Sequence, residues 1–137
     1  MRILDNISVD GIIDGNSGTY FEIAVPDSAV NDFCLCLNLL SYELIPSFKI
    51  GQQTILEIAC DRQLVNTYGN GFYKGNVVSA QLSRDALGYM SAFYLRYVRD
   101  GVSAVDHIDL ELPAKNSAKT VFLTFTIKSV RLPIANT

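Results

Sequence analysis

The stretch His107-Ile-Asp-Leu-Glu-Leu112 places an apolar side chain at every second position. A period of two is typical of a strand that turns one face to a core and the other to water. Residues 121–128 alternate in the same way, and a polar, turn-rich segment at 113–119 separates the two runs. The sequence therefore predicts a β-hairpin with a longish loop in the last third of the chain.

Further strands are expected upstream of this hairpin. Residues 20–25 alternate and are followed by Pro26, and residues 54–60 form another apolar run of strand length. Residues 1–13 are apolar enough for an added strand, but Asp10-Gly11 interrupts them, so the pattern leaves that segment open.

Residues 83–101 predict a helix with a signal at each end. Ser83 is a good N-cap, Asp85 lies in the first turn, and Arg96 and Arg99 precede Gly101, which matches the chemistry of helix termini. Seven apolar residues recur on one broad face: Ala86, Leu87, Met90, Phe93, Tyr94, Tyr97 and Val98. We expect this face to pack on the sheet.

Residues 28–44 are ambiguous between helix and strand. Their apolar residues recur at spacings of three to four, yet the middle of the segment also alternates. The Asp27-Ser28 start favours a helix. No repeat or linker divides the chain, so we predict a single α+β domain over residues 1–137, with a mostly antiparallel sheet and one or two amphipathic helices packed on one face.

The stretch Asn66-Thr-Tyr-Gly-Asn-Gly-Phe-Tyr-Lys-Gly-Asn76 mixes aromatics with glycines and asparagines. Asn70-Gly71 is a strong tight-turn dipeptide, so the stretch is interpreted as a hairpin tip or wide turn. Its aromatic side chains either bind a partner or fold back onto the core, and the sequence does not choose between these.

Composition excludes several classes of protein. Hydrophobic residues make up 49 % of the chain and charged residues 18 %, which argues against disorder. The first residues lack a signal-peptide pattern, and no apolar run approaches membrane-spanning length. Three cysteines with no disulfide or zinc pattern suggest free thiols in a reducing cytoplasm.

Motifs for catalysis, metals and cofactors are weak. Asp14-Gly-Asn16 begins like a calcium loop, but the later ligand positions fail, so we predict no metal and no cofactor. The single histidine, His107, has Asp109 and Glu111 on the same strand face, and this leaves a small enzyme or ligand-binding domain as one alternative. We nevertheless expect no enzymatic activity.

Charge points to a protein partner. Residues 1–68 hold nine acids and three bases, whereas residues 69–137 hold five acids and eight bases, an asymmetry that survives only if the halves do not interleave in the fold. A pI of about 5.0 argues against direct nucleic-acid binding.

We therefore expect an acidic inhibitor, such as an immunity or antitoxin-like protein that masks the active site of a basic toxin or nuclease. An oligomeric assembly subunit, for example a homodimer, is a further alternative. The residues assigned to partner binding are Tyr68, Asn70, Phe72, Tyr73 and Lys74 with the acids Asp14, Glu22, Glu57 and Asp61.

Overall fold

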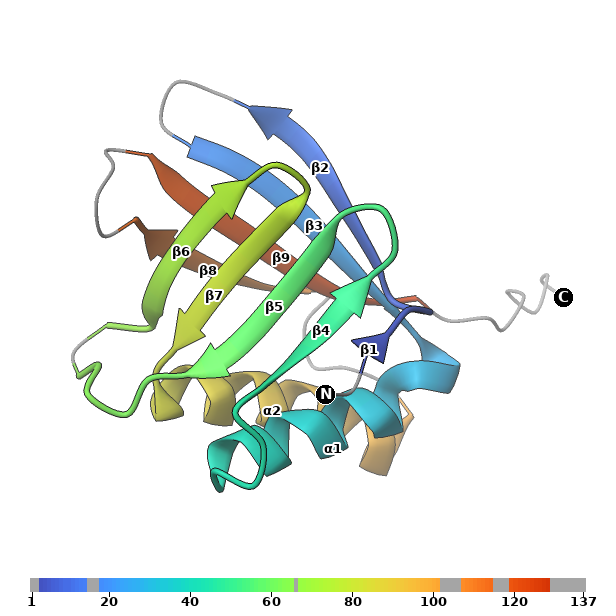
Figure 1. Cartoon of the computed structure of the whole chain (residues 1–137). Helices are drawn as coiled ribbons and strands as arrows, with labels where there is room; N and C mark the ends of the chain where they lie inside the picture. Colours follow the sequence, from blue (N-terminus) through green and yellow to red (C-terminus); the bar gives the residue numbers. More distant parts are fainter. Residues whose placement is uncertain (1–2, 15–17, 66, 102–106, 115–118, 129–137) are drawn as a thin grey trace, which may run out of the picture.

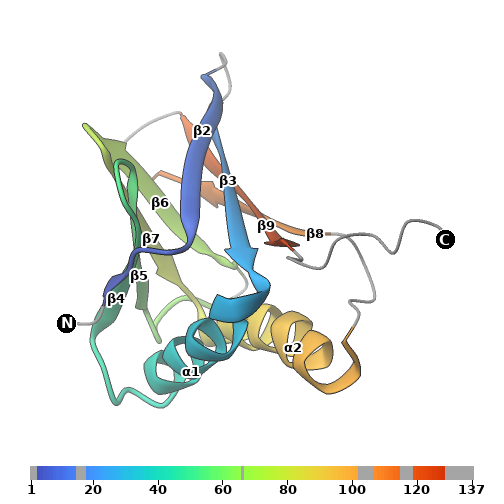
Figure 2. The same ribbon diagram turned by 90° about the vertical axis from the view of Figure 1, so that its right-hand side faces the viewer.

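The strands form two sheets that make the two walls of a wedge, and two helices fill its open end (Figures 1 and 2). The computed structural model describes residues 3–14, 18–65, 67–101, 107–114 and 119–128. In chain order the elements are β1 (Ile3–Leu4), β2 (Ser8–Asp14), β3 (Gly18–Pro26), a 3-10 turn (Asp27–Ala29), α1 (Val30–Ser41), β4 (Ser47–Gly51), β5 (Ile55–Cys60), β6 (Gly69–Lys74), β7 (Val77–Leu82), α2 (Arg84–Asp100), β8 (His107–Pro113) and β9 (Thr120–Lys128).

The first sheet has the strand order β1-β4-β5-β7-β6 and the second β2-β3-β9-β8. Four strand pairs are antiparallel hairpins: β2/β3, β4/β5, β6/β7 and β8/β9. The pairs that join two hairpins within a sheet, β5/β7 and β3/β9, are parallel. The α+β class is confirmed, as is the predicted hairpin β8/β9. The prediction placed all strands in one sheet, whereas the structure has two sheets. Each helix carries the chain from one sheet to the other: α1 connects β3 to β4, and α2 connects β7 to β8.

Both predicted helices are present. The Ser83 hydroxyl accepts a hydrogen bond from the Ala86 amide at 3.1 Å, and Gly101 ends α2 with a φ of 75°. The ambiguous segment after Pro26 is helical over Val30–Ser41. Its apolar face carries Phe33, whose ring contacts one ring from each sheet and one from α2: Phe48, Phe125 and Tyr94.

The chain repeats one unit, hairpin–helix–hairpin. The first copy is β2-β3-α1-β4-β5 and the second is β6-β7-α2-β8-β9, so each sheet contains one hairpin from each copy. The registers of the parallel pairs match as well, because Phe21 lies opposite Leu123 in one sheet and Val78 lies opposite Leu56 in the other. The molecule is therefore built as an interleaved pair of related halves.

The two copies share the positions of their buried residues but not the identities of those residues. The repeat was therefore not visible in the sequence. Buried positions of α1 and α2 fall at the same places along the two helices. The matching pairs are Val30 and Leu87, Phe33 and Met90, Cys34 and Ser91, Cys36 and Phe93, and Leu37 and Tyr94. Different side chains thus occupy equivalent places in one shared core.

The predicted turn at Asn70-Gly71 is wrong. Both residues lie inside β6, and the hairpin turns at Gly75-Asn76, where Gly75 has a φ of 65°. A Cβ on Gly71 would lie 2.8 Å from the Cβ of Val121 and 2.9 Å from that of Leu112. Gly71 is therefore needed for the close approach of the two sheets and not for a bend.

Candidate protein-binding face

The outer face of the sheet β2-β3-β9-β8 carries a row of acidic side chains. Asp10 pairs with Glu22, Glu22 with Thr124, and Thr124 with Asp109, so one register position crosses all four strands. The three carboxylates are exposed, because their neighbours along each strand point into the core. We call Asp10, Glu22 and Asp109 the acidic row.

A flat aromatic surface lies beside the acidic row. Tyr20 pairs with Phe122 across β3 and β9, and the two rings stack with centroids 4.3 Å apart and planes 7° apart. Glu111 lies opposite Phe122 on β8 and is exposed. The face therefore combines carboxylates with stacked rings, the two groups that recognise guanidinium and ammonium ions.

The charge of this row is largely uncompensated within the described residues. Thr124 donates its hydroxyl to Asp109 at 2.7 Å, and the Nε2 atom of His107 lies 3.3 Å from the second carboxylate oxygen of Asp109. No ion pair of Asp10, Glu22 or Glu111 is present in the described part of the chain. Like charges directly opposite each other, as at Asp10 and Glu22, destabilise a sheet.

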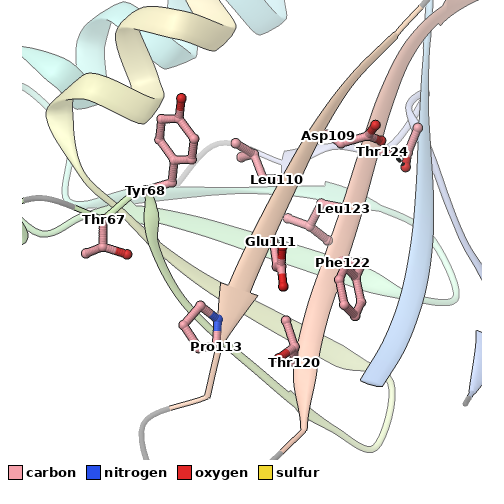
Figure 3. A pocket seen from close by; sticks show the side chains of 10 residues that line it. All are labelled: Thr67, Tyr68, Asp109, Leu110, Glu111, Pro113, Thr120, Phe122, Leu123 and Thr124. Carbon is pink, nitrogen blue, oxygen red and sulfur yellow. Dashed lines mark hydrogen bonds between the residues drawn. The ribbon is translucent and has the colours of Figure 1, made fainter. Parts of the chain in front are cut away.

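A cleft of about 680 Å³ lies along the edge of this sheet at β8 (Figure 3). We call it the β8 cleft. Figure 3 shows Tyr68 and Thr67 on one side of β8 and Phe122 and Thr120 on the other. The lining residues are Thr67, Tyr68, Asp109, Leu110, Glu111, Pro113, Thr120, Phe122, Leu123 and Thr124.

His107 lies outside the lining of this cleft. Its side chain is half exposed, and its contact with Asp109 is on the open face of the sheet. Cys60 ends β5 in the opposite sheet, and burial raises the pKa of its thiol although Arg62 and Arg84 lower it. In the described structure, His107 therefore has Asp109 as its neighbour, and Cys60 lies in the other sheet.

The predicted acidic residues do not form one surface. Glu22 belongs to the acidic row, whereas Glu57 lies on the outer face of the other sheet, where its carboxylate is 3.3 Å from the Ser47 hydroxyl. Asp61 follows β5 and accepts a hydrogen bond from the Gln63 amide at 3.0 Å. Asp14 ends β2, and its side chain lies outside the described part of the structure.

The predicted aromatic residues are also dispersed. Tyr68 stacks with Tyr89 of α2 at 6.1 Å, and Tyr73 packs edge-on against Phe21 at 5.1 Å. Phe72 is 56 % exposed on the edge strand β6, which also carries Asn70 and Lys74. The aromatics thus divide between packing and exposure, and partner binding by these residues stays a prediction.

Sequence reasoning missed the acidic row as a unit. The alternation of residues 20–25 and 107–112 already placed Glu22, Asp109 and Glu111 on polar faces, whereas the segment of Asp10 was left open. What joins them is the parallel pairing of β3 with β9, two strands far apart in the chain. The interleaving of the halves also explains why the acid excess of residues 1–68 is distributed over both sheets.

The helices of the described segments lack the length and apolar character needed to cross a membrane, and the same segments contain no group of His, Cys, Asp or Glu suited to hold a metal ion. The sequence matches no protein-family model and no curated protein, and the fold matches no solved structure.

Proposed function

We propose that this chain is a protein-binding domain that uses the acidic row to hold a basic partner. The observation that carries the proposal is the register that aligns Asp10, Glu22 and Asp109 across one exposed face. Adjacent strands are about 4.8 Å apart, so Asp10 and Glu22 lie side by side, and Thr124 lies between Glu22 and Asp109. A cationic partner would relieve their mutual repulsion.

The concrete form of the proposal is an inhibitor, immunity or antitoxin-like, that masks a basic toxin or nuclease in the cytoplasm. Nucleic-acid-binding sites concentrate lysine and arginine to contact phosphates, and a line of carboxylates is complementary to such a site. The Tyr20–Phe122 stack offers a surface on which a guanidinium group can lie. Complementary charge also gives fast association, which an inhibitor needs.

The test uses the full-length chain as bait in a lysate of its source, at about 50 mM and about 500 mM salt, because screening weakens contacts between exposed charges. The variant Asp10→Asn/Glu22→Gln/Asp109→Asn removes the acidic row without adding bulk. We expect the unmodified chain to capture a basic protein in stoichiometric amount at low salt, and the variant to lose at least about tenfold in affinity for it. Nuclease activity of the captured protein is measured before and after release.

A matched variant controls for total charge. Asp5→Asn/Asp32→Asn/Asp85→Asn also removes three acids, but none of them lies in the acidic row or among the residues assigned to partner binding. We expect this variant to keep the partner. Equal losses in both variants, or capture of an acidic partner, would contradict the proposal.

A further inference from the structure

The two halves differ at one edge of each sheet. In the first sheet, the outer edge of β4 is covered by β1, which runs parallel to it with Ile3 opposite Lys49 and Leu4 opposite Ile50. In the second sheet, β8 occupies the place of β4, and no described segment pairs with its outer edge. The hairpin registers make Asp109 and Leu110 the equivalents of Lys49 and Ile50.

The chain that would cover β8 by analogy is held elsewhere. β1 precedes β2, and the equivalent residues precede β6. There the carbonyl of Tyr68 accepts a hydrogen bond from the Ser83 amide at 2.8 Å, and the Tyr68 ring stacks on Tyr89. Tyr68 is thereby fixed to the end of β7 and to α2, and it lines the β8 cleft together with residues of β8 and β9.

We propose that an extended segment of the basic partner enters the β8 cleft and pairs with β8 as an added parallel strand. The inference rests on the proposed function for the charge of that partner. The first sheet provides the template, because the molecule already closes the equivalent edge in this manner. Main-chain hydrogen bonds at an open sheet edge supply affinity, and the alternate side chains supply specificity.

The register specifies the chemistry of the added strand. Leu4 is buried at 6 % exposure opposite Ile50, so the residue opposite Leu110 should be apolar and point into the wedge. Its neighbours would lie beside Asp109 and Glu111 on the outer face, where lysine or arginine fits. The expected segment therefore alternates basic and apolar residues. A volume of about 680 Å³ is within the usual range for ligand pockets.

The probe is a short synthetic peptide that alternates lysine and valine, and the control is the same peptide with alternate backbone nitrogens methylated. Methylation keeps the charge and removes the donors that a strand needs. We expect the unmodified peptide to bind at least about tenfold more tightly, because two or more hydrogen bonds are lost on methylation. It should also slow amide exchange in residues 107–113 more than in the edge strands β2 and β6.

Variants of the chain locate the contact. Asp109→Lys/Glu111→Lys places two cations beside the added strand, whereas Asp10→Lys/Glu22→Lys makes the same change of charge at the far side of the face. We expect the first pair to weaken peptide binding more than the second. Equal binding of the two peptides, with both still sensitive to the acidic row, would overturn strand addition and leave the proposed function intact. Failure of both peptides to bind at low salt would count against the charge complementarity itself.

Two other occupants of the edge give distinct results. If residues 107–113 are already protected in the free chain and lose protection when the chain is ended at Lys128, the chain itself covers β8 and the proposal is wrong. Protection that rises with protein concentration in the absence of peptide would indicate a second copy and would also overturn it.

Discussion

The outer faces of the two sheets have the same backbone register but different charge: one row is balanced and the other is acidic. One row reads Lys49, Glu57, Ser79 and Phe72, and the equivalent row of the other sheet reads Asp109, Thr124, Glu22 and Asp10. In the first row a base stands opposite an acid, whereas the second row has three acids and no base. The backbone arrangement is shared by the two sheets, and the candidate function belongs to the side chains of one of them.

The interior shows a second difference between the halves. Val9 of β2 corresponds to Gly71 of β6, since each lies opposite an equivalent residue of the adjoining strand, Ile23 or Ala80. The sheets consequently approach each other closely where β6 meets β8 and β9. Exchanging residues between equivalent positions tests how far the halves have diverged.

The largest effect is expected from Gly71→Val, which gives β6 the residue that β2 has. The new side chain would collide with the Cβ atoms of Val121 and Leu112, which cannot move without their backbones. We expect the free energy of unfolding to fall by about 3 kcal/mol, at the upper end of overpacking costs. Urea denaturation measures the change.

Gly88→Ala is the control for this substitution. Gly88 lies on α2 with open space around its Cα, so alanine should stabilise the helix by about 0.5–1 kcal/mol. A Gly71→Val chain as stable as the original would mean that the sheets separate there without cost.

The next effect is a loss of stability at alkaline pH that originates in one half. Burial raises the pKa of the Cys34 thiol from its ordinary 9.0 to about 11, and the equivalent residue of α2 is Ser91, which does not titrate. A thiol with a raised folded-state pKa stabilises the fold below its unfolded pKa and loses this contribution as pH rises through the folded pKa. We expect the free energy of unfolding to fall by on the order of 2 kcal/mol between about pH 9 and about pH 11.

Cys34→Ser should remove part of this alkaline loss in the free energy of unfolding. The stability of each chain at neutral pH is the reference for the comparison. Burial, and secondarily Cys34, also raises the pKa of the Tyr94 phenol, so a smaller alkaline slope should persist in the variant. Identical pH profiles of the two chains, measured by urea denaturation, would show that Cys34 remains protonated in both states or titrates equally in both.

A smaller effect is expected at Tyr94. Its hydroxyl is buried and has no hydrogen-bond partner among the described residues, and its equivalent in α1 is the apolar Leu37. Tyr94→Phe removes the unpaired group and keeps the ring that packs on Phe33 and Phe93. We expect a gain of about 1 kcal/mol in the free energy of unfolding. A loss instead would indicate that the hydroxyl is hydrogen-bonded in solution.

The smallest effects concern the two outer rows. Glu22→Lys places a base between Asp10 and Thr124 and should stabilise the chain, while Lys49→Glu places an acid opposite Glu57 and should destabilise it, each by about 0.2–1 kcal/mol. Both changes should shrink at high salt. Denaturation midpoints at low and high salt decide the sign, and changes of the same sign would refute the electrostatic contrast between the rows.

Local elements were predictable because their signals are local. Three signals depend only on residues close together in the sequence: the caps of α2, the alternation in β8 and β9, and the helical spacing before Leu40. The turn at Asn70-Gly71 was mispredicted because glycine can either allow a turn or allow close packing. At Gly71 it allows close packing against Val121 and Leu112.

The division into two sheets was not predictable in this way. It depends on the parallel pairs β3/β9 and β5/β7, each of which joins a strand of one half to a strand of the other without a sequence signal. The acidic row follows from β3/β9 pairing, and the β8 cleft follows from the placement of Thr67 and Tyr68 beside β8. A site assembled by long-range pairing is therefore visible from sequence only as separate outward-facing acids.

The parallel pairs also constrain how the chain can be made. β3 and β5 belong to the first half, yet each has one partner, β9 or β7, in the second half. A nascent chain that has emerged only as far as β5 therefore has two central strands that each lack one of their two neighbours. The connection between the halves passes through Val65, which is 72 % exposed. Proteolysis at that point would leave two fragments, and each sheet would contain one hairpin from each fragment. We expect the fragments to stay associated as a noncovalent heterodimer.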